Sequence, residues 1–320
     1  MANAVESLLP GGEEVEILIV DDGSSDRTAQ IADDYEKQYP GIVRAIHQEN
    51  GGHGDAVMTG LKHASGLYYK VVDSDDWLDR EAYPKVLEAL RSLTDEPVDM
   101  LISNYIYDKA GAKHKHVTRY RRTLPRNRVF GWDEAKRFRK GHYMLMHSVI
   151  YRTGMLRECG ISLPKHTFYV DDLYVYFPLP YVERMYYVDE DLYHYYIGRE
   201  GQSVQEEVMT RRIDQVLQVK RLMVSCADPF SVKSGRCCSY MLNFLEIVMT
   251  VASVLLIKSG TEESQKKKKE LWEFIQKNNP QVYQTRRRRL TGRLTHLPGR
   301  AGRALVVGLY RICRLIFGFN

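Results

Sequence analysis

The chain has 320 residues, of which 44% are hydrophobic and 27% are charged, an ordinary balance for a globular protein with one large domain or two modest ones. Its five cysteines are odd in number and form no C-x-x-C pair, which disfavours a disulfide framework or a zinc knuckle and favours a reducing cytoplasm. The net charge of +5 is uneven, because residues 258–320 carry a net +11 and residues 1–257 a net −6, so the basic tail predicts an anionic partner, either nucleic acid or a membrane surface.

The first quarter of the chain alternates helices and strands. A helix over 1–9 ends at Pro10-Gly11-Gly12, and Ser24 or Ser25 is a candidate N-cap for the next helix. The predicted strands are the apolar runs 16–20, 42–46 and 67–72, and a further helix spans 55–63. This β-α-β-α-β order with short connections predicts a parallel sheet with helices on both faces.

The middle of the chain is less regular. We predict a helix over 80–93, strands over 98–102, 148–151, 186–188 and 192–196, a helix that starts near 169–174, and an irregular excursion over 103–140. From Met209 onward the pattern is helical. The apolar stretch 241–257 contains Asn243 and Glu246 and is short for a membrane span, so a buried core helix is favoured.

Carboxylates follow the strand that ends at Val72. Asp73, Asp75 and Asp76 come within four positions, and carboxylates packed this closely repel one another unless a cation relieves the charge. Mg²⁺ and Mn²⁺ prefer oxygen ligands, and open α/β sheets bind ligands at the carboxyl ends of their strands. The functional interpretation is therefore a metal–diphosphate site, and the structural alternative is a solvated acidic turn that caps the next helix near Asp79.

The last helix, over about 298–319, differs from the others. Its arginines at positions 300, 303, 311 and 314 share one arc, and the other faces are apolar. Such a helix suits an anionic membrane interface, with arginines reaching phosphate headgroups, and it equally suits a helix docked on its own domain with a basic outer face. The Arg286–Arg289 run favours the membrane interpretation.

Three acidic motifs occur in a characteristic order. They are Val20-Asp21-Asp22-Gly23-Ser24-Ser25-Asp26, Val72-Asp73-Ser74-Asp75-Asp76 and Val170-Asp171-Asp172-Leu173, with Asn50-Gly51-Gly52 before the second and Tyr193-x-Tyr195 through Ser203 after the third. In this combination the chain resembles the family-two glycosyltransferases of the GT-A fold, specifically those of bacterial cell-surface polysaccharides, over about residues 13–205. The resemblance implies an α/β fold with a mostly parallel GT-A sheet over 1–205 and an α-helical C-terminal region over 206–320.

The resemblance also implies an inverting transfer from a nucleotide-diphospho-sugar, usually a UDP-sugar, to a glycan or lipid-linked acceptor. It places Asp21 and Asp22 against the nucleobase and ribose, and it makes Asp73 and Asp75 the D-x-D motif for Mn²⁺ or Mg²⁺, with Asp75 closest to the metal. The pair Asp171-Asp172 takes the place of the family's Glu-Asp motif, so the general base is carried to Asp172, with Asp171 as second choice. Arg199 is implied as a contact to the donor diphosphate.

One feature departs from the family pattern. The family has a central strand, rich in Val and Ile and followed by a Tyr-Asn turn, before its first helix, whereas Met1 here falls inside that helix. We therefore expect strands 16–20 and 67–72 to flank a missing strand, and we expect the natural gene to extend upstream.

Three other functions compete with a sugar transferase at the cytoplasmic face of the membrane. The first is an inactive or unstable truncated remnant of such an enzyme. The second is a metal-dependent phosphatase with Asp73 as nucleophile, which the absence of an Asp-x-Asp-x-Thr/Val arrangement disfavours. The third is a nucleic-acid binder, which is disfavoured because only Tyr283 lies near the Arg286–Arg289 run.

Overall fold

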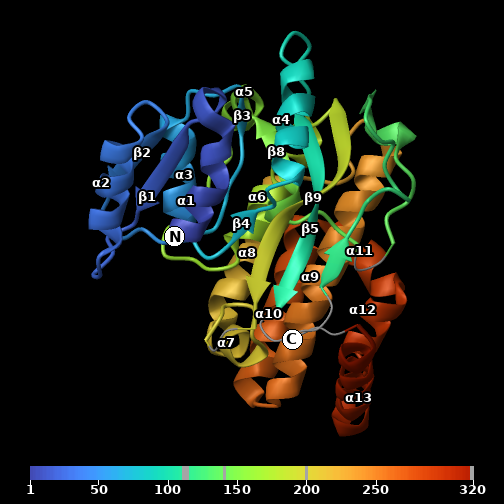
Figure 1. Ribbon diagram of the computed structural model, residues 1–320. Helices are drawn as coiled ribbons and strands as arrows, with labels where there is room; N and C mark the ends of the chain where they lie inside the picture. Colours follow the sequence, from blue (N-terminus) through green and yellow to red (C-terminus); the bar gives the residue numbers. More distant parts are fainter. Residues whose placement is uncertain (110–114, 140–141, 199–200, 318–320) are drawn as a thin grey trace. The chain divides into compact units, whose positions relative to one another are not determined.

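The computed structural model describes residues 1–109, 115–139, 142–198 and 201–317, and these form two compact units (Figure 1). Unit 1 comprises Met1–Phe138 and Met144–Ile197, and unit 2 comprises Arg139–Tyr143 and Gly198–Asn320. The compact first unit thus ends at Ile197, whereas the sequence indicated a boundary after residue 205.

Unit 1 begins with a small parallel sheet. Its strands are β1 (Ile17–Asp21) and β2 (Val43–His47), with Ile17 opposite Val43, and they are accompanied by helices α1 (Ala2–Leu8), α2 (Thr28–Gln38) and α3 (His53–His63). Alternate residues of β1 are buried, and Ile17 and Ile19 pack with Val5 of α1 and Ala32 of α2. The predicted order of helices and strands is confirmed here, except that Arg27 occupies the N-cap position of α2 in place of Ser24 or Ser25.

A second sheet forms the rest of unit 1. Its strand order is β3-β8-β5-β9-β4, and β6 and β7 pair with β5 and β9 at its margin. The bounds are β3 (Tyr68–Tyr69), β4 (Trp77–Leu78), β5 (Met100–Lys109), β6 (His116–Thr118), β7 (Val129–Phe130), β8 (Val149–Arg152) and β9 (Met185–Ile197).

The strand directions correct the expectation of a mostly parallel sheet. Only β5 and β9 run parallel within this second sheet, and the other described pairs are antiparallel. Parallel neighbours need a crossover connection, usually a helix. The path from β5 to β9 includes the helices α5 (Thr153–Glu158) and α6 (Val170–Tyr176), whereas the described residues between β5 and β8 form only short strands and 3₁₀ turns.

Two strands are longer than the sequence predicted. β5 continues through Ser103 and Asn104 to Lys109, and β9 is continuous across the polar residues that divided it into two in the sequence analysis. The buried Asn104 amide donates to Asp189 at 3.0 Å and to Asp191 at 2.9 Å. These polar residues satisfy one another across the β5–β9 pair, where the register also shifts, so a break in the hydrophobic pattern is not a break in the strand.

β1 and β3, which the sequence analysis expected to flank a missing strand, lie in different sheets, and no ladder joins them within the described residues. Side chains bridge the two sheets instead. The Glu16 carboxylate accepts hydrogen bonds from the backbone N–H groups of Ser65 at 2.5 Å and Gly66 at 2.6 Å. The Ser7 hydroxyl accepts one from Leu78 N–H at 3.0 Å. These polar contacts link the N-terminal helices and strands to the rest of unit 1.

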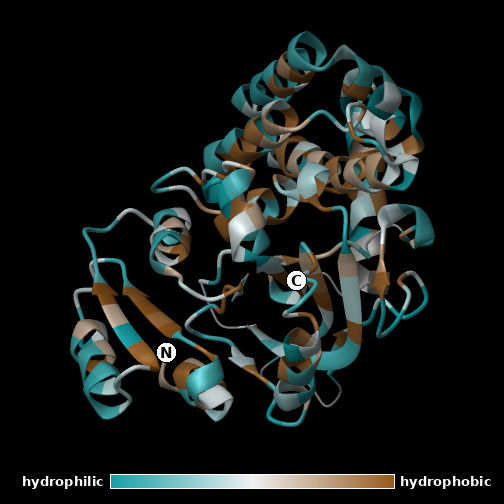
Figure 2. Cartoon of the chain, turned by 90° about the horizontal axis from the view of Figure 1, so that it is seen from above, coloured by the Kyte–Doolittle hydropathy of each residue, from teal (hydrophilic) through white to brown (hydrophobic). Residues whose placement is uncertain are grey.

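Unit 2 is helical, as predicted. Its helices are α7 (Glu206–Arg211), α8 (Ile213–Cys226), α9 (Gly235–Ser259), α10 (Glu262–Asn278), α11 (Pro280–Arg288), α12 (Leu290–Thr295) and α13 (Gly299–Phe317). By length and composition α9 is able to cross a membrane, but 78% of its apolar window is buried within the fold, as expected of a core helix. Figure 2 shows hydrophobic residues gathered between these helices and hydrophilic ones on their outer sides.

A buried acid in α9 holds part of the arginine run. Glu246 accepts hydrogen bonds from Arg286 and Arg289, both at 2.6 Å, and from Thr291 at 2.8 Å. Glu246 and Arg286 are only 5% and 2% exposed. Two members of the run that favoured the membrane interpretation, Arg286 and Arg289, therefore bind an acid inside unit 2.

We predict that Glu246→Gln lowers the free energy of unfolding by about 3–5 kcal/mol, because it leaves the Arg286 charge buried without its partner. Urea denaturation measures the change. Glu270→Gln is the matched control, since the Glu270–Lys266 pair is exposed and 4.0 Å apart, and such pairs contribute about 0–1 kcal/mol. Equal losses in the two variants would contradict a special role for Glu246.

Candidate active site

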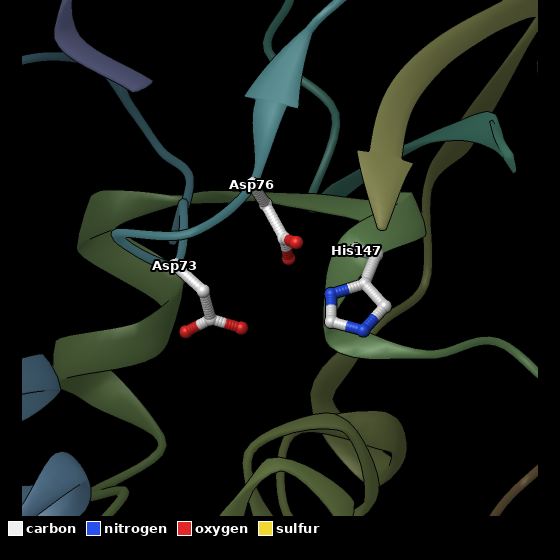
Figure 3. A group of neighbouring side chains, drawn as sticks. All are labelled: Asp73, Asp76 and His147. Carbon is white, nitrogen blue, oxygen red and sulfur yellow. The ribbon is translucent and has the colours of Figure 1, made fainter. Parts of the chain in front are cut away.

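The second acidic motif forms the turn between β3 and β4. Asp73 and Asp76 face His147, which lies in the 3₁₀ turn Met146–Ser148 immediately before β8 (Figure 3). Ligand atoms of the three side chains all lie within 4.8 Å of one another. β3 is shorter than the predicted strand 67–72, and it pairs antiparallel with β8, so the segment after β3 that carries the carboxylates comes near the turn before β8 that carries His147. The group does not include Asp75, which is half-buried.

Strand β9 fixes the carboxylate of Asp76. The Tyr193 hydroxyl and the Tyr196 backbone N–H donate to its two oxygens, each at 2.7 Å. Asp76 is 1% exposed, and burial, reinforced by the charge of Asp73, raises its pKa to about 7. The turn therefore holds its innermost carboxyl poised between the charged and neutral forms.

A lysine lies beside these carboxylates. Lys70 Nζ donates to the His147 carbonyl at 2.8 Å and lies 4.9 Å from the centroid of the Tyr193 ring. Burial lowers the pKa of Lys70 to about 7, and burial likewise lowers the pKa of His147 to about 4. Neither residue was predicted. The only signal for Lys70 was a cation inside an otherwise apolar strand next to carboxylates, and His147 lay in a stretch without periodicity.

The first acidic motif is hydrogen-bonded to the glycine-rich loop at Asn50-Gly51-Gly52. The Asp22 carboxylate accepts hydrogen bonds from the backbone N–H groups of Gly51 and Gly52, both at 2.7 Å. Gly52 has φ +83°, a conformation that glycine adopts readily, and a Cβ there would lie 3.1 Å from the backbone of His166. His166 N–H in turn donates to the Gly51 carbonyl at 2.6 Å. Asp21 is buried and accepts from Ser24 N–H at 3.1 Å.

His53 connects all three motifs. It begins α3, and its Nε2 lies 3.0 Å from Asp73 Oδ1. The pKa of His53 is raised: burial opposes the rise, and the hydrogen bond to Asp73 and the charges of Asp73, Asp171 and Asp22 outweigh it. One carboxylate from each predicted motif thus acts on a single imidazole, which places the three motifs at one site.

The third motif occupies the first turn of α6. Asp171 and Asp172 follow Tyr169, which has φ +66°, and His166 nearby has φ +48°. Non-glycine residues in this region are strained by about 1–3 kcal/mol each, and such strain clusters at functional sites. Arg199, the predicted diphosphate contact, lies outside the described residues. The structural alternative for the acidic turn is confirmed only for Asp79, which accepts from Glu81 and Ala82 N–H at the start of α4 (Ala82–Ser92).

The donor set at Asp73 and Asp76 fits a divalent cation. An ionised carboxylate offers about four acceptor positions, and protein groups occupy two of those on Asp76. His147 Nδ1 is buried and makes no hydrogen bond within the described part of the chain. Oxygen and imidazole ligands of this kind suit first-row divalent metals.

We predict that Asp22→Ala speeds amide hydrogen exchange over residues 48–53, because two N–H groups lose a charged acceptor, and each such bond contributes about 1.5–3 kcal/mol. Mass spectrometry after exchange in D₂O measures this. Asp26→Ala is the control, since its exposed carboxylate caps Thr28 N–H and does not reach the loop. Unchanged exchange over 48–53 in Asp22→Ala would remove Asp22 from this role.

The comparisons with known proteins agree with this geometry. Residues 1–154 match the family model described as "Glycosyl transferase family 2". The chain is 41% identical over 75 residues to the uncharacterized glycosyltransferase EpsJ of Bacillus subtilis, covering 23% of this chain and 22% of EpsJ. It is 27% identical over 202 residues to the putative glycosyltransferase EpsH of the same organism, covering 58% of this chain and 53% of EpsH. The chain therefore spans about half or less of these relatives.

Solved structures of similar fold include S. aureus TarS 1–349, with a TM-score of 0.68 and 17% identity over 97% of this chain and 87% of that one. The same protein in complex with UDP-GlcNAc gives a TM-score of 0.66 and 19% identity over 96% and 88%. At this identity the likeness establishes the fold. Residues 1–154 thus match glycosyl transferase family 2, and the chain as a whole has the GT-A fold.

Proposed function

We propose that the protein is an inverting glycosyltransferase that moves a sugar from a nucleotide-diphospho-sugar to a hydroxyl of a glycan or lipid-linked acceptor in cell-surface polysaccharide synthesis. The observation that carries this proposal is the set of contacts that brings the three family motifs together at His53. Asp22 holds the Gly51–Gly52 backbone just before His53, and His53 lies 3.0 Å from Asp73. His166, shortly before the third motif, donates to the Gly51 carbonyl. A single acidic turn occurs in many proteins, whereas three carboxylate motifs gathered around one imidazole in a GT-A fold match the needs of this reaction.

A UDP-sugar is the donor class that we favour. TarS, which shares the fold, has been crystallised with UDP-GlcNAc and with UDP. In this proposal Asp21 and Asp22 lie against the nucleobase and ribose, and the loop held by Asp22 shapes that pocket. Arg199 contacts the donor diphosphate.

The chemistry has two demands that the site residues meet. A sugar hydroxyl is a weak nucleophile, so Asp172 takes its proton as general base, with Asp171 as the alternative. Negative charge develops on the departing diphosphate, and Mn²⁺ or Mg²⁺ held by Asp73 and Asp75 would supply the compensating positive charge when bound. The start of α6 orients both candidate bases in its first turn.

We predict that Asp172→Asn lowers kcat for UDP-sugar turnover by about 10²–10⁴, the usual contribution of a general base, while UDP-sugar binding changes little. Steady-state kinetics and calorimetric binding give the two quantities. Asp171→Asn is the matched control from the same helical turn. If Asp171→Asn loses kcat and Asp172→Asn does not, the two roles are exchanged.

We also propose that the protein is cytoplasmic and lies on the inner face of an anionic membrane through α13. This helix packs inward through Val306, which joins Val254 and Ile257 in a buried cluster. Leu305, Leu309 and Ile312 follow at i, i+4 and i+7 on another face, and they are 51%, 38% and 54% exposed. Docking and membrane contact are therefore compatible, because they use different faces of one helix.

The charge around this apolar face favours anionic lipid. Arg300 and Arg311 are exposed, while Arg303 is half-buried, and the side chain of Arg314 lies outside the described set. Each basic residue near an anionic surface contributes about 1 kcal/mol to binding. Of the four arginines in the predicted stripe, Arg300 and Arg311 are therefore exposed among the residues whose side chains the structure describes.

We predict that the double change Leu305→Ser and Ile312→Ser weakens sedimentation with phosphatidylcholine–phosphatidylglycerol vesicles by at least about tenfold, since each buried apolar side chain contributes about 1.5–3 kcal/mol. Leu67→Ser is the control, because Leu67 is 41% exposed but lies in unit 1. Equal binding by wild type and double variant would contradict membrane contact through this face. A dimer in solution that the double change dissociates would assign the face to a second copy instead.

A further inference from the structure

We propose that His147 is a nitrogen ligand of the divalent cation, which it holds together with Asp73 and Asp76. This deepens the proposed function, on which it rests for the identity of the diphosphate that shares the cation. Asp73 belongs also to the D-x-D motif, whereas Asp76 and His147 lie outside it. The group does not include Asp75, the other D-x-D residue.

The first ground is an unpaired nitrogen. His147 is 5% exposed, and its Nδ1 makes no hydrogen bond within the described part of the chain. A buried polar atom left without a partner costs about 1–3 kcal/mol. Figure 3 shows the ring directed toward the two carboxylates, so a cation between them would meet the unpaired nitrogen and offset that cost.

The second ground is the rigid support of the ring. His147 stacks on Tyr193, with centroids 4.8 Å apart and an interplanar angle of 20°, and it lies 4.1 Å from the Tyr195 ring. Its backbone carbonyl accepts from Lys70 Nζ at 2.8 Å. Metal ligands are commonly held in this way by neighbouring groups before the metal arrives. The stack on β9 and the lysine fix the ring without using its nitrogen.

The third ground is access. The Asp73 side chain is 24% exposed, whereas Asp76 and His147 are 1% and 5% exposed, so Asp73 is the member of the group that solvent reaches most easily. Lys70 and His53 are two basic groups that oppose cation binding here, because both lie beside the same carboxylates.

The ligand set predicts which ion is bound. Mg²⁺ requires near-ideal octahedral oxygen ligation, and an imidazole is a poor ligand for it. Mn²⁺ accepts oxygen ligands and stands above Mg²⁺ in its affinity for nitrogen, so the site is expected to select Mn²⁺. Two other imidazoles are rivals for the same role. His53 lies 3.0 Å from Asp73, and His194 is paired with Asp79 and Asp108.

The test uses the full chain with Mn²⁺, in the presence and absence of UDP. Pulsed electron paramagnetic resonance detects coupling of bound Mn²⁺ to a ligand ¹⁴N, and the free Mn²⁺ signal gives the affinity. His147→Phe keeps an aromatic ring for the stack on Tyr193 and removes the nitrogen. We expect the ¹⁴N coupling of the wild type to disappear in this variant and Mn²⁺ affinity to fall by at least about tenfold.

His53→Phe and His194→Phe are the controls, and both should retain the ¹⁴N coupling. A coupling lost in either control but kept in His147→Phe would overturn the assignment, as would Mn²⁺ bound by the wild type without nitrogen coupling. His147→Asn guards against a folding defect, because its amide oxygen is expected to recover part of the affinity without the nitrogen signal. None of these readouts requires sugar transfer, so a protein with the coupling but no transferase activity would reject the proposed function and leave this site intact.

Discussion

The candidate site depends most on the two hydrogen bonds that the Asp22 carboxylate accepts from the backbone N–H groups of Gly51 and Gly52. The carboxylate is a charged acceptor on two adjacent N–H groups, which is among the stronger hydrogen-bond arrangements in proteins. The loop that it fixes leads into His53, and the same loop accepts a hydrogen bond from His166, upstream of Asp171 and Asp172. One carboxylate thereby sets the positions of groups that are far apart in the sequence.

A second constraint is the crowding of negative charge, because Asp73 and Asp76 lie together in a partly buried turn. His53 and Lys70 are basic groups close to these carboxylates. Tyr193 and Tyr196 donate hydrogen bonds to the turn. These groups offset the charge only in part, as the raised pKa of Asp76, caused by burial and by the charge of Asp73, indicates. The site remains receptive to further positive charge while the turn keeps its shape.

The sequence predicted more of the architecture than of the site chemistry. Periodicity and turn residues located β1, β2, α3 and α9, because local burial patterns reflect these elements directly. It missed the continuity of β5 and β9, since Asn104 and its acidic partners look like loop residues until they pair across strands. It likewise missed His147, whose importance arises only when β8 pairs with β3. The pairings that matter there are long-range, and no local pattern encodes them.

The separation of β1 from the larger sheet has a consequence for tolerance to substitution. Where a ladder joins two strands, many backbone hydrogen bonds hold them together, so replacing one surface side chain has little effect on their association. Here the connection passes through individual side chains such as Glu16, whose carboxylate takes the N–H groups of Ser65 and Gly66. Exposed acidic residues usually vary freely, but a lysine at this position has no acceptor and would remove both hydrogen bonds, whereas glutamine keeps an oxygen that is able to accept them. The hydrogen-bonding capacity of this side chain therefore matters here more than its charge.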